Sequence, residues 1–275
     1  MVFILVLYKC IIEYSVSYLT ISKSLAYANK KGILFIFDNS PDFQSIKNID
    51  ISIWEKFIYI HCPENKGLGF AYNSGADYAR ENNIDWVVLL DQDTSFSEDY
   101  IYQLKKSIDL YPNIKLFAPI IKLKNNIPFS PTRYKHKRGY CVELNSGIYS
   151  LLKYSPVNSG IVINTEYFWK VGGYNPLITL DFADYQFIER FRRTKKYFFV
   201  IDTIAIQNFS NDERNIKKLQ TRFRIYCECA KKCNRNNIIE SLEYFYSVFR
   251  HTLGLIIKTK KISFFWIFAT NYLLK

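Results

Sequence analysis

The chain has 275 residues, 49% of them hydrophobic, which is enough to bury a sizeable core within one α/β domain. Its 37 Lys and Arg residues outnumber its 25 Asp and Glu residues, and the resulting net charge of +12 favours an anionic partner. Nucleic acid is not predicted as that partner, because the sequence contains no motif of an RNA- or DNA-binding module. Six scattered cysteines and the lack of a secretory-signal pattern predict a cytoplasmic protein without a disulfide framework.

Apolar runs alternate with polar turns through the first part of the chain. Residues 2–8 form the first run, which we interpret as a core strand rather than a targeting segment. The run Ile33–Phe37 ends in an acidic turn at Asp38, and a third run covers Phe57–Ile60. The segment Asn65–Gly75 then combines glycines, which permit close approach to the backbone, with a lysine and the start of a helix. Because a helix N-terminus attracts anions, this segment is predicted to bind one.

The most informative motif follows the next apolar run. Asp85–Leu90 has the pattern of a strand buried on both faces, and it ends in Asp91-Gln92-Asp93. Two carboxylates side by side in a crevice are costly unless a cation lies between them, and oxygen ligands suit Mg²⁺ or Mn²⁺. A solvated turn is the alternative, because so short a motif often occurs by chance.

Strand and helix periodicity lapses between Pro128 and Pro156, so this stretch is predicted to be irregular. Within it, Arg133–Tyr140 carries basic and aromatic residues. A long irregular segment in a compact domain is often a functional lid, and a solvated surface loop is the alternative interpretation.

The last part of the chain, residues 211–275, is predicted to be a helical extension. Residues 211–257 have apolar side chains at helical spacing with basic residues between them, which indicates two helices. The apolar stretch 262–274 is shorter than the roughly 20 residues needed to span a bilayer. Because lysines flank it on both sides, it is predicted either to anchor the protein at a membrane surface or to pack as a core helix or dimer contact.

In this order, the motifs resemble those of family 2 glycosyltransferases of the GT-A fold, especially the bacterial rhamnosyltransferase-like branch. The resemblance covers residues 1–210. It implies an α/β fold in which helices flank a mostly parallel central sheet. The implied domains are a catalytic domain at 1–210 and C-terminal helices at 211–275.

The resemblance also assigns the donor site. Asp38 would accept a hydrogen bond from the pyrimidine base of the donor. Asp93 would be the principal metal ligand, and Asp91 would share the metal site and lie nearer the ribose. Four residues of the glycine segment would line the nucleotide pocket: Asn65, Gly67, Asn73 and Gly75.

The acceptor side is assigned to the second half of the domain. Val157–Ile163 resembles the family's strand beside the acceptor, and Val171–Asn175 resembles the glycine turn before the catalytic acid. Leu180–Arg190 resembles the family's acid-rich helix, which places the general base at Asp184. Because acceptors in this family are often lipid-linked diphosphate sugars, the basic residues of 133–140 would bind their phosphates unless that loop is merely solvated.

Two positions depart from the family pattern. Ile206–Ser210 has Gln207 where relatives carry a metal-binding histidine, so the metal would be held less tightly, or mainly by the second aspartate and the diphosphate. Gln186 replaces a second acid in the helix. This leaves Asp184 with fewer like-charged neighbours, although Asp181 is expected one helical turn away.

The predicted function is that of an inverting, metal-dependent glycosyltransferase of the hexosyl- or rhamnosyltransferase type. It would use Mn²⁺ or Mg²⁺ to move a sugar from a UDP- or dTDP-linked donor to a saccharide acceptor, with a lipid-linked acceptor as one version. The expected pathway is synthesis of a bacterial surface polysaccharide such as O-antigen or capsule, in the cytoplasm or at the inner face of the membrane. A catalytically silent binding or scaffold protein of the same fold is the alternative, and donor hydrolysis is a further one.

Overall fold

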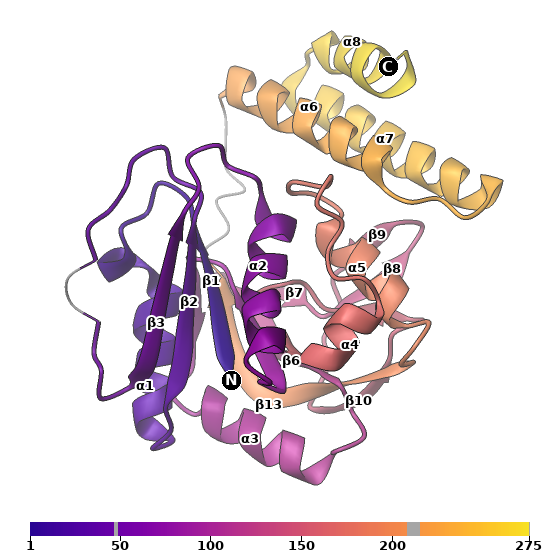
Figure 1. Cartoon of the computed structure of the whole chain (residues 1–275). Coiled ribbons are helices and arrows are strands. Elements are labelled where there is room, and N and C mark those ends of the chain that lie inside the picture. The colour runs from indigo at the N-terminus through magenta and orange to yellow at the C-terminus, as the bar shows by residue number, and fades with distance from the viewer. Residues whose placement is uncertain (47–48, 208–214, 275) are drawn as a thin grey trace.

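A computed structural model describes residues 1–46, 49–207 and 215–274 of the chain (Figure 1). The strands are β1 (Val2–Leu7), β2 (Gly32–Asp38), β3 (Trp54–His61), β4 (Trp86–Leu90), β5 (Thr94–Phe96), β6 (Leu116–Leu123), β7 (Pro128–Ser130), β8 (Thr132–Lys135), β9 (Arg138–Tyr140), β10 (Gly147–Ser150), β11 (Tyr154–Ser155), β12 (Val162–Asn164) and β13 (Tyr197–Gln207). The helices are α1 (Val16–Tyr27), α2 (Leu68–Glu81), α3 (Tyr100–Leu110), α4 (Thr165–Lys170), α5 (Ala183–Phe191), α6 (Ile216–Lys232), α7 (Ile238–Thr259) and α8 (Ser263–Phe268), with a 3₁₀ turn η1 (Ile12–Tyr14) and a π-helical turn η2 (Ala269–Leu273).

Most strands belong to one mixed sheet in the order β10-β13-β6-β12-β4-β1-β2-β3, with β5 against β13 and β7 against β6. Strand β1 pairs in parallel with β2 and β4, and β2 pairs in parallel with β3. Strand β12 lies antiparallel between β4 and β6, while β13 runs parallel to β6. The predicted mostly parallel sheet is therefore confirmed, and the carboxyl ends of β1, β2 and β4 meet at one edge.

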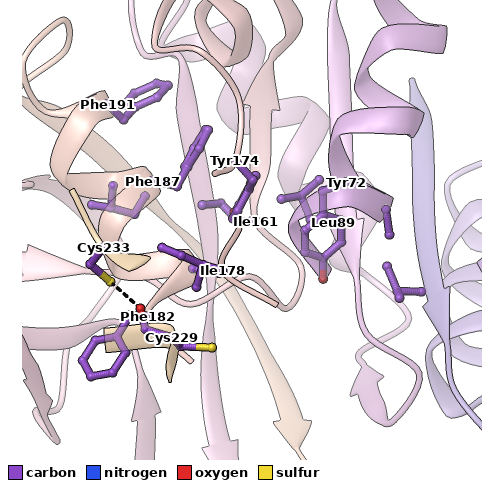
Figure 2. Packing of buried hydrophobic residues seen from close by; sticks show 14 of the residues in the cluster. Tyr72, Leu89, Ile161, Tyr174, Ile178, Phe182, Phe187, Phe191, Cys229 and Cys233 are labelled. Carbon is purple, nitrogen blue, oxygen red and sulfur yellow. Dashed lines mark hydrogen bonds between the residues drawn. The ribbon is translucent and has the colours of Figure 1, made fainter. Parts of the chain in front are cut away.

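Helices cover both faces of this sheet, which explains why its central strands are apolar throughout. Every residue of β1 is buried, and successive residues enter different cores because strand side chains alternate between faces. One core contains Phe3 with Ile21 of α1 and Leu104 of α3. The other contains Ile4 with Tyr72 of α2. Figure 2 shows this second core, where side chains from α2, β4, α5 and α6 meet.

The stretch between Pro128 and Pro156 is not irregular, so that prediction is wrong. It contains β7 to β11, and within the described residues β8, β9 and β11 form a separate three-stranded sheet. These strands are only two to four residues long, too short for a two-residue periodicity to stand out in the sequence. The strand predicted at Val157–Ile163 is shorter than expected, because β12 covers Val162–Asn164.

Helices α6, α7 and α8 lie together at one end of the molecule, beyond α2 and α5 (Figure 1). The first two confirm the pair of helices predicted for residues 211–257. The division predicted at residue 210 falls within 208–214, outside the described residues, and stays a prediction. No helix in the described ranges is long and apolar enough to cross a membrane.

The apolar stretch 262–274 packs against the protein with one side. Phe264 and Phe268 are buried, and the ring of Phe268 lies 5.8 Å from that of Phe249 in α7. Trp266, by contrast, is 65% exposed, and Leu274 is also exposed. The core-helix alternative therefore describes one face of this stretch, while the other face is open to solvent.

Candidate active site

The first aspartate of the Asp-Gln-Asp motif lies directly after β4, at the edge where the parallel strands end. Asp91 Oδ1 accepts a hydrogen bond from Thr94 Oγ1 at 2.6 Å. Its Oδ2 accepts from the hydroxyl of Ser159 and from Gln207 Nε2, the latter at 2.9 Å. Because β12 lies beside β4 and β13 ends nearby, three segments distant in sequence fix the orientation of one carboxylate.

Both carboxylates of the motif resist ionisation. Burial raises the pKa of Asp91 despite the hydrogen bonds from Ser159 and Thr94. Burial, followed by the negative charge of Asp91, raises the pKa of Asp93 to about 6. A bound cation would reverse this shift by stabilising both ionised forms. The pair is therefore electrostatically unsatisfied by the protein alone.

A third oxygen beside the pair has no hydrogen-bond partner among the described residues. Gln207 is 8% exposed, and among the described residues its Oε1 accepts no hydrogen bond, although its Nε2 is bound to Asp91. Two carboxylates and an amide oxygen form the hard donor set that suits Mg²⁺ or Mn²⁺. In the part of the chain that the structure describes, no three His, Cys, Asp or Glu side chains gather to form a metal site. These residues therefore fit a divalent ion whose remaining ligands come from a substrate or water.

Asp184, the predicted base, lies in the first turn of α5. The turn before the helix is tight, with Phe182 in a left-handed conformation at φ +67°. Asp184 Oδ1 accepts from the backbone N–H of Tyr185 at 2.8 Å. Burial raises the pKa of Asp184 to about 6, and the charge of Asp181 adds to the rise. A carboxylate with this pKa can hold a proton near neutral pH.

The expectation that Asp181 lies one helical turn from the base is wrong. Helix α5 begins at Ala183, so Asp181 belongs to the preceding turn, where its Oδ1 accepts from Arg222 Nη2 of α6 at 2.8 Å. Gln186 is 3% exposed, and neither polar atom of its side chain has a partner within the described ranges. Its polar group is therefore buried without compensation.

Tyr72 lies within electrostatic range of both the Asp91–Asp93 pair and Asp184. This side chain of α2 is fully buried, and its hydroxyl has no hydrogen-bond partner among the described residues. Its pKa is raised by burial and then by the charges of Asp91, Asp184 and Asp93, in that order. All three carboxylates therefore lie within electrostatic range of one phenol, and the structure brings together the acids predicted from two halves of the sequence. Figure 2 shows Tyr72 beside Leu89, near the end of β4.

Asp38 terminates β2 at the same edge of the sheet and is fully buried. Its Oδ1 accepts from Ser40 N at 2.9 Å. Its Oδ2 accepts from Gln44 Nε2 at 2.6 Å and from Tyr59 Oη at 2.8 Å. Asp38 thus shapes the loop after β2 with three protein donors, and its contact with a base stays a prediction.

The glycine segment positions the start of α2 against the turn that leads to α5. Gly67 has φ +86°, and a Cβ there would lie 2.7 Å from the carbonyl oxygen of Thr179. Asn65 also has a positive φ, at +50°. Only a residue without a Cβ allows this approach at Gly67, so the glycine is required by packing whether or not it also faces a nucleotide.

Two further predicted pocket residues make their contacts inside the protein. The side chain of Asn73 donates to the carbonyl of Tyr174 at 2.8 Å and accepts from its N–H at 2.7 Å. A Cβ on Gly75 would lie 2.6 Å from Cγ1 of Ile4, so this glycine allows α2 to pack on β1. Both residues hold α2 in place, and their roles toward a nucleotide stay predictions.

Two side chains of the basic stretch 133–140 are engaged with carboxylates of the protein itself, and phosphate binding by this stretch stays a prediction. Lys137 is buried, and its Nζ lies 2.5 Å from Glu189 Oε1 and 3.8 Å from Glu240 Oε1. His136 Nδ1 lies 3.1 Å from Glu243 Oε1. These two side chains are engaged with carboxylates of α5 and α7, so they tie the turn between β8 and β9 to both helices.

Sequence reasoning did not single out Ser159, Thr94 and Tyr72 as parts of this site. Ser159 lies in a motif that was recognised, but its hydroxyl could be assigned to Asp91 only once β12 was placed beside β4. Tyr72 gave no signal, because a tyrosine in a helix next to a strand is normally a core residue. Residues 208–210, where the family pattern continues after Gln207, lie outside the described residues.

A mostly parallel sheet with an Asp-x-Asp pair at its strand ends and a buried carboxylate nearby is the arrangement expected of the GT-A fold. Residues 19–216 match the family described as Glycosyl transferase family 2, and the chain belongs to this family. None of the curated proteins searched matches it.

Solved structures show the same fold. S. aureus TarS 1–349 in complex with UDP matches with a TM-score of 0.53 and 11% identity, over 88% of this chain and 69% of that one. GalNAc-T7 with UDP, GalNAc and Mn²⁺ matches with a TM-score of 0.53 and 11% identity, over 99% of this chain and 58% of that one. At such identities the similarity establishes the fold alone.

Proposed function

We propose that this family 2 glycosyltransferase moves a sugar from a nucleoside diphosphate sugar to an acceptor hydroxyl, with inversion at the anomeric carbon. The observation that carries this proposal is that Asp91, Asp93 and Asp184 all lie within electrostatic range of the buried phenol of Tyr72. A base for the acceptor and oxygen ligands for a diphosphate-bound cation are then present in one site.

Asp184 acts as the general base. It removes the proton from the acceptor hydroxyl while that oxygen attacks the anomeric carbon. The new glycosidic bond forms as the bond from the anomeric carbon to the diphosphate oxygen breaks, so the proton ends on Asp184 and the nucleoside diphosphate leaves. A single displacement inverts the configuration and leaves no covalent intermediate on the protein.

Mn²⁺ or Mg²⁺, when bound, supplies positive charge that neutralises the leaving diphosphate. Asp93 and Asp91 would hold it, and the unpartnered oxygen of Gln207 would take the place that a histidine fills in relatives. Thr94 and Ser159 contribute by fixing the orientation of Asp91.

The donor is proposed to be UDP- or dTDP-linked. The complexes of TarS with UDP and with UDP-GlcNAc, and of GalNAc-T7 with UDP and Mn²⁺, support a uridine nucleotide and Mn²⁺. The resemblance to the rhamnosyltransferase-like branch supports dTDP. The nucleotide pocket would be lined by Asp38, Asn65, Gly67, Asn73 and Gly75, with Asp91 toward the ribose.

The acceptor is proposed to be a saccharide, in a lipid-linked form in one version of this hypothesis. We place the reaction in bacterial surface polysaccharide synthesis, such as that of O-antigen or capsule, in the cytoplasm or at the inner face of the membrane. This assignment is supported by the resemblance of the motifs, and the sugar type (hexosyl or rhamnosyl) is to be decided by the donor assay.

The test is incubation of the purified protein with UDP- and dTDP-sugars, with and without Mn²⁺, while release of nucleoside diphosphate is measured. Asp184→Asn, which keeps the size of the side chain, is the matched variant. Donor binding without metal-dependent release in any mixture of donor and saccharide acceptor would favour the silent scaffold. Release that does not depend on an acceptor would indicate donor hydrolysis.

A further inference from the structure

Helix α7 has two apolar faces, and only one of them is covered. Tyr244, Val248 and Leu255 are buried against the rest of the protein. On the other side, five residues are exposed at a spacing of three, four, seven and four residues: Ile239, Leu242, Tyr246, Leu253 and Ile257. This spacing aligns them on one stripe along the 22-residue helix, which is about 33 Å long at 1.5 Å per residue.

Helix α8 extends this apolar surface. The ring of Phe268 lies 5.9 Å from Phe245 and 5.8 Å from Phe249, so α8 is held beside the stripe on α7. Ile262 and Trp266 are then 64% and 65% exposed. We call the exposed stripe of α7, together with Ile262 and Trp266, the α7–α8 face; both helices lie at one end of the molecule, away from the sheet (Figure 1). Exposed apolar side chains in this number on two adjacent helices mark an interaction surface.

The charge of this region is strongly positive. Residues 216–274 contain 11 Lys and Arg against 3 Asp and Glu, so 11 − 3 = 8 of the 12 net positive charges lie in the C-terminal helices. Residues 244–274 contain no acidic residue and four basic ones, all exposed: Arg250, Lys258, Lys260 and Lys261. The stripe therefore has basic side chains along most of its length, with Glu240 and Glu243 near its N-terminal end. This combination fits a partner that is apolar inside and anionic at its surface.

We propose that the α7–α8 face docks on the surface of an anionic lipid bilayer, with both helices lying in the plane of the headgroups. The stripe enters the boundary between headgroups and acyl chains, Trp266 and Tyr246 lie at headgroup depth, and the lysines contact anionic lipids. A second copy of the chain is a poorer partner, because a two-fold contact would oppose two sets of the same four cations, and residues 244–274 contain no carboxylate to pair with them.

In the docked orientation the turn before the catalytic helix lies on the inner side of α7, about 10 Å, one helix diameter, from the lipid. Phe182, two residues before Asp184, contacts the ring of Tyr226 in α6 at 4.7 Å and that of Tyr244 in α7 at 5.7 Å. The turn that positions the proposed base therefore packs on α6 and on α7, one of the two docking helices. Delivery of a lipid-linked acceptor to this turn rests on the proposed function, whereas the docking surface does not.

Co-sedimentation of the full chain with vesicles tests the proposal. One set is an equal mixture of phosphatidylglycerol and phosphatidylcholine, and the other is phosphatidylcholine alone. The chain is expected to bind the first set and not the second. Lys258→Gln/Lys260→Gln/Lys261→Gln should weaken binding by about 10²-fold, and Ile257→Ser/Trp266→Ser by about 10-fold or more.

Matched controls come from the opposite side of the molecule. Lys23→Gln/Lys30→Gln/Lys31→Gln removes the same charge, and Ile51→Ser/Tyr27→Ser removes similar exposed apolar surface, since all five side chains are exposed. Both controls should bind as the unmodified chain does. Circular dichroism of every variant establishes that it is folded.

Equal loss of binding in test and control variants would overturn the proposal. Absence of binding to the vesicles that contain phosphatidylglycerol would also overturn it. A dimer in vesicle-free solution that dissociates only in the Ile257→Ser/Trp266→Ser variant would assign the face to a second copy instead. Release of nucleoside diphosphate with a water-soluble acceptor should be the same in all variants. Failure of docking and failure of the proposed activity are therefore separate results.

Discussion

The raised pKa of Asp184 leads to a prediction about how kcat depends on pH. A general base works only when it is ionised, so activity is present above its pKa and is lost as pH falls through that value. Burial raises this pKa from the ordinary 3.8 to about 6. At pH 5 only about one tenth of the carboxyl would be ionised, so kcat should fall about tenfold between pH 7 and pH 5. With an ordinary carboxyl the rate would be almost unchanged over this interval.

The assay is kcat for release of nucleoside diphosphate at saturating donor, acceptor and Mn²⁺ between pH 4.5 and 8.5. Saturating metal matters, because Asp93 also has a pKa of about 6 and a bound cation would lower it. Asp184→Asn should lower kcat by about 10²-fold or more with donor affinity unchanged. The fall of kcat at low pH, the acid limb of the profile, should be absent from the residual rate of this variant. An unchanged acid limb in this variant would refute the assignment of the base. So would a greater loss in Asp181→Asn, which would move the base to the preceding turn.

Three further substitutions test the site and its supports. Asp93→Asn should abolish Mn²⁺-dependent donor binding in calorimetry while the fold stays intact, and full wild-type activity in excess EDTA would contradict the metal role. Asn73→Ala removes both hydrogen bonds to the backbone of Tyr174 and should lower the free energy of unfolding by about 1–3 kcal/mol in denaturant titration. An unchanged midpoint would show that these two hydrogen bonds are dispensable for stability. Gly67→Ala should destabilise by about 1–3 kcal/mol, because φ is +86° and the new Cβ would meet Thr179; a stability equal to wild type would contradict the packing argument.

The sequence predicted the elements whose signal is local. The continuous apolar runs of β2 and β4 are buried on both faces, and the polar residues that end them, Asp38 and Asp91, do lie at the same sheet edge. The acid-rich segment does form α5, with Asp184 in its first turn. These features follow from periodicity and from the geometry of parallel strands, which need no knowledge of distant partners.

Contacts between distant segments could not be predicted. Ser159 and Gln207 reach Asp91 across 68 and 116 residues, because β12 enters the sheet antiparallel beside β4 and β13 ends near β5. The burial of Lys137 depends likewise on carboxylates from α5 and α7. Neither arrangement has a local pattern in the sequence, since each is decided by how the elements pack.

The exposed stripe on α7 could not be predicted from the sequence for a related reason. A helix with apolar residues on most of its surface is normally buried on most of its surface. The sequence therefore predicts a surface contact only for the shorter stretch 262–274, although Ile239 and Ile257 of α7 are as open to solvent as Trp266. Which apolar face a helix buries is set by its neighbours.

The most direct test of the central claim is release of nucleoside diphosphate by the purified chain from a set of UDP- and dTDP-sugars with saccharide acceptors. We expect release with at least one donor, dependent on Mn²⁺ or Mg²⁺ and on the acceptor, and reduced by about 10²-fold or more in Asp184→Asn. Metal-dependent release at the wild-type rate in Asp184→Asn would contradict the account.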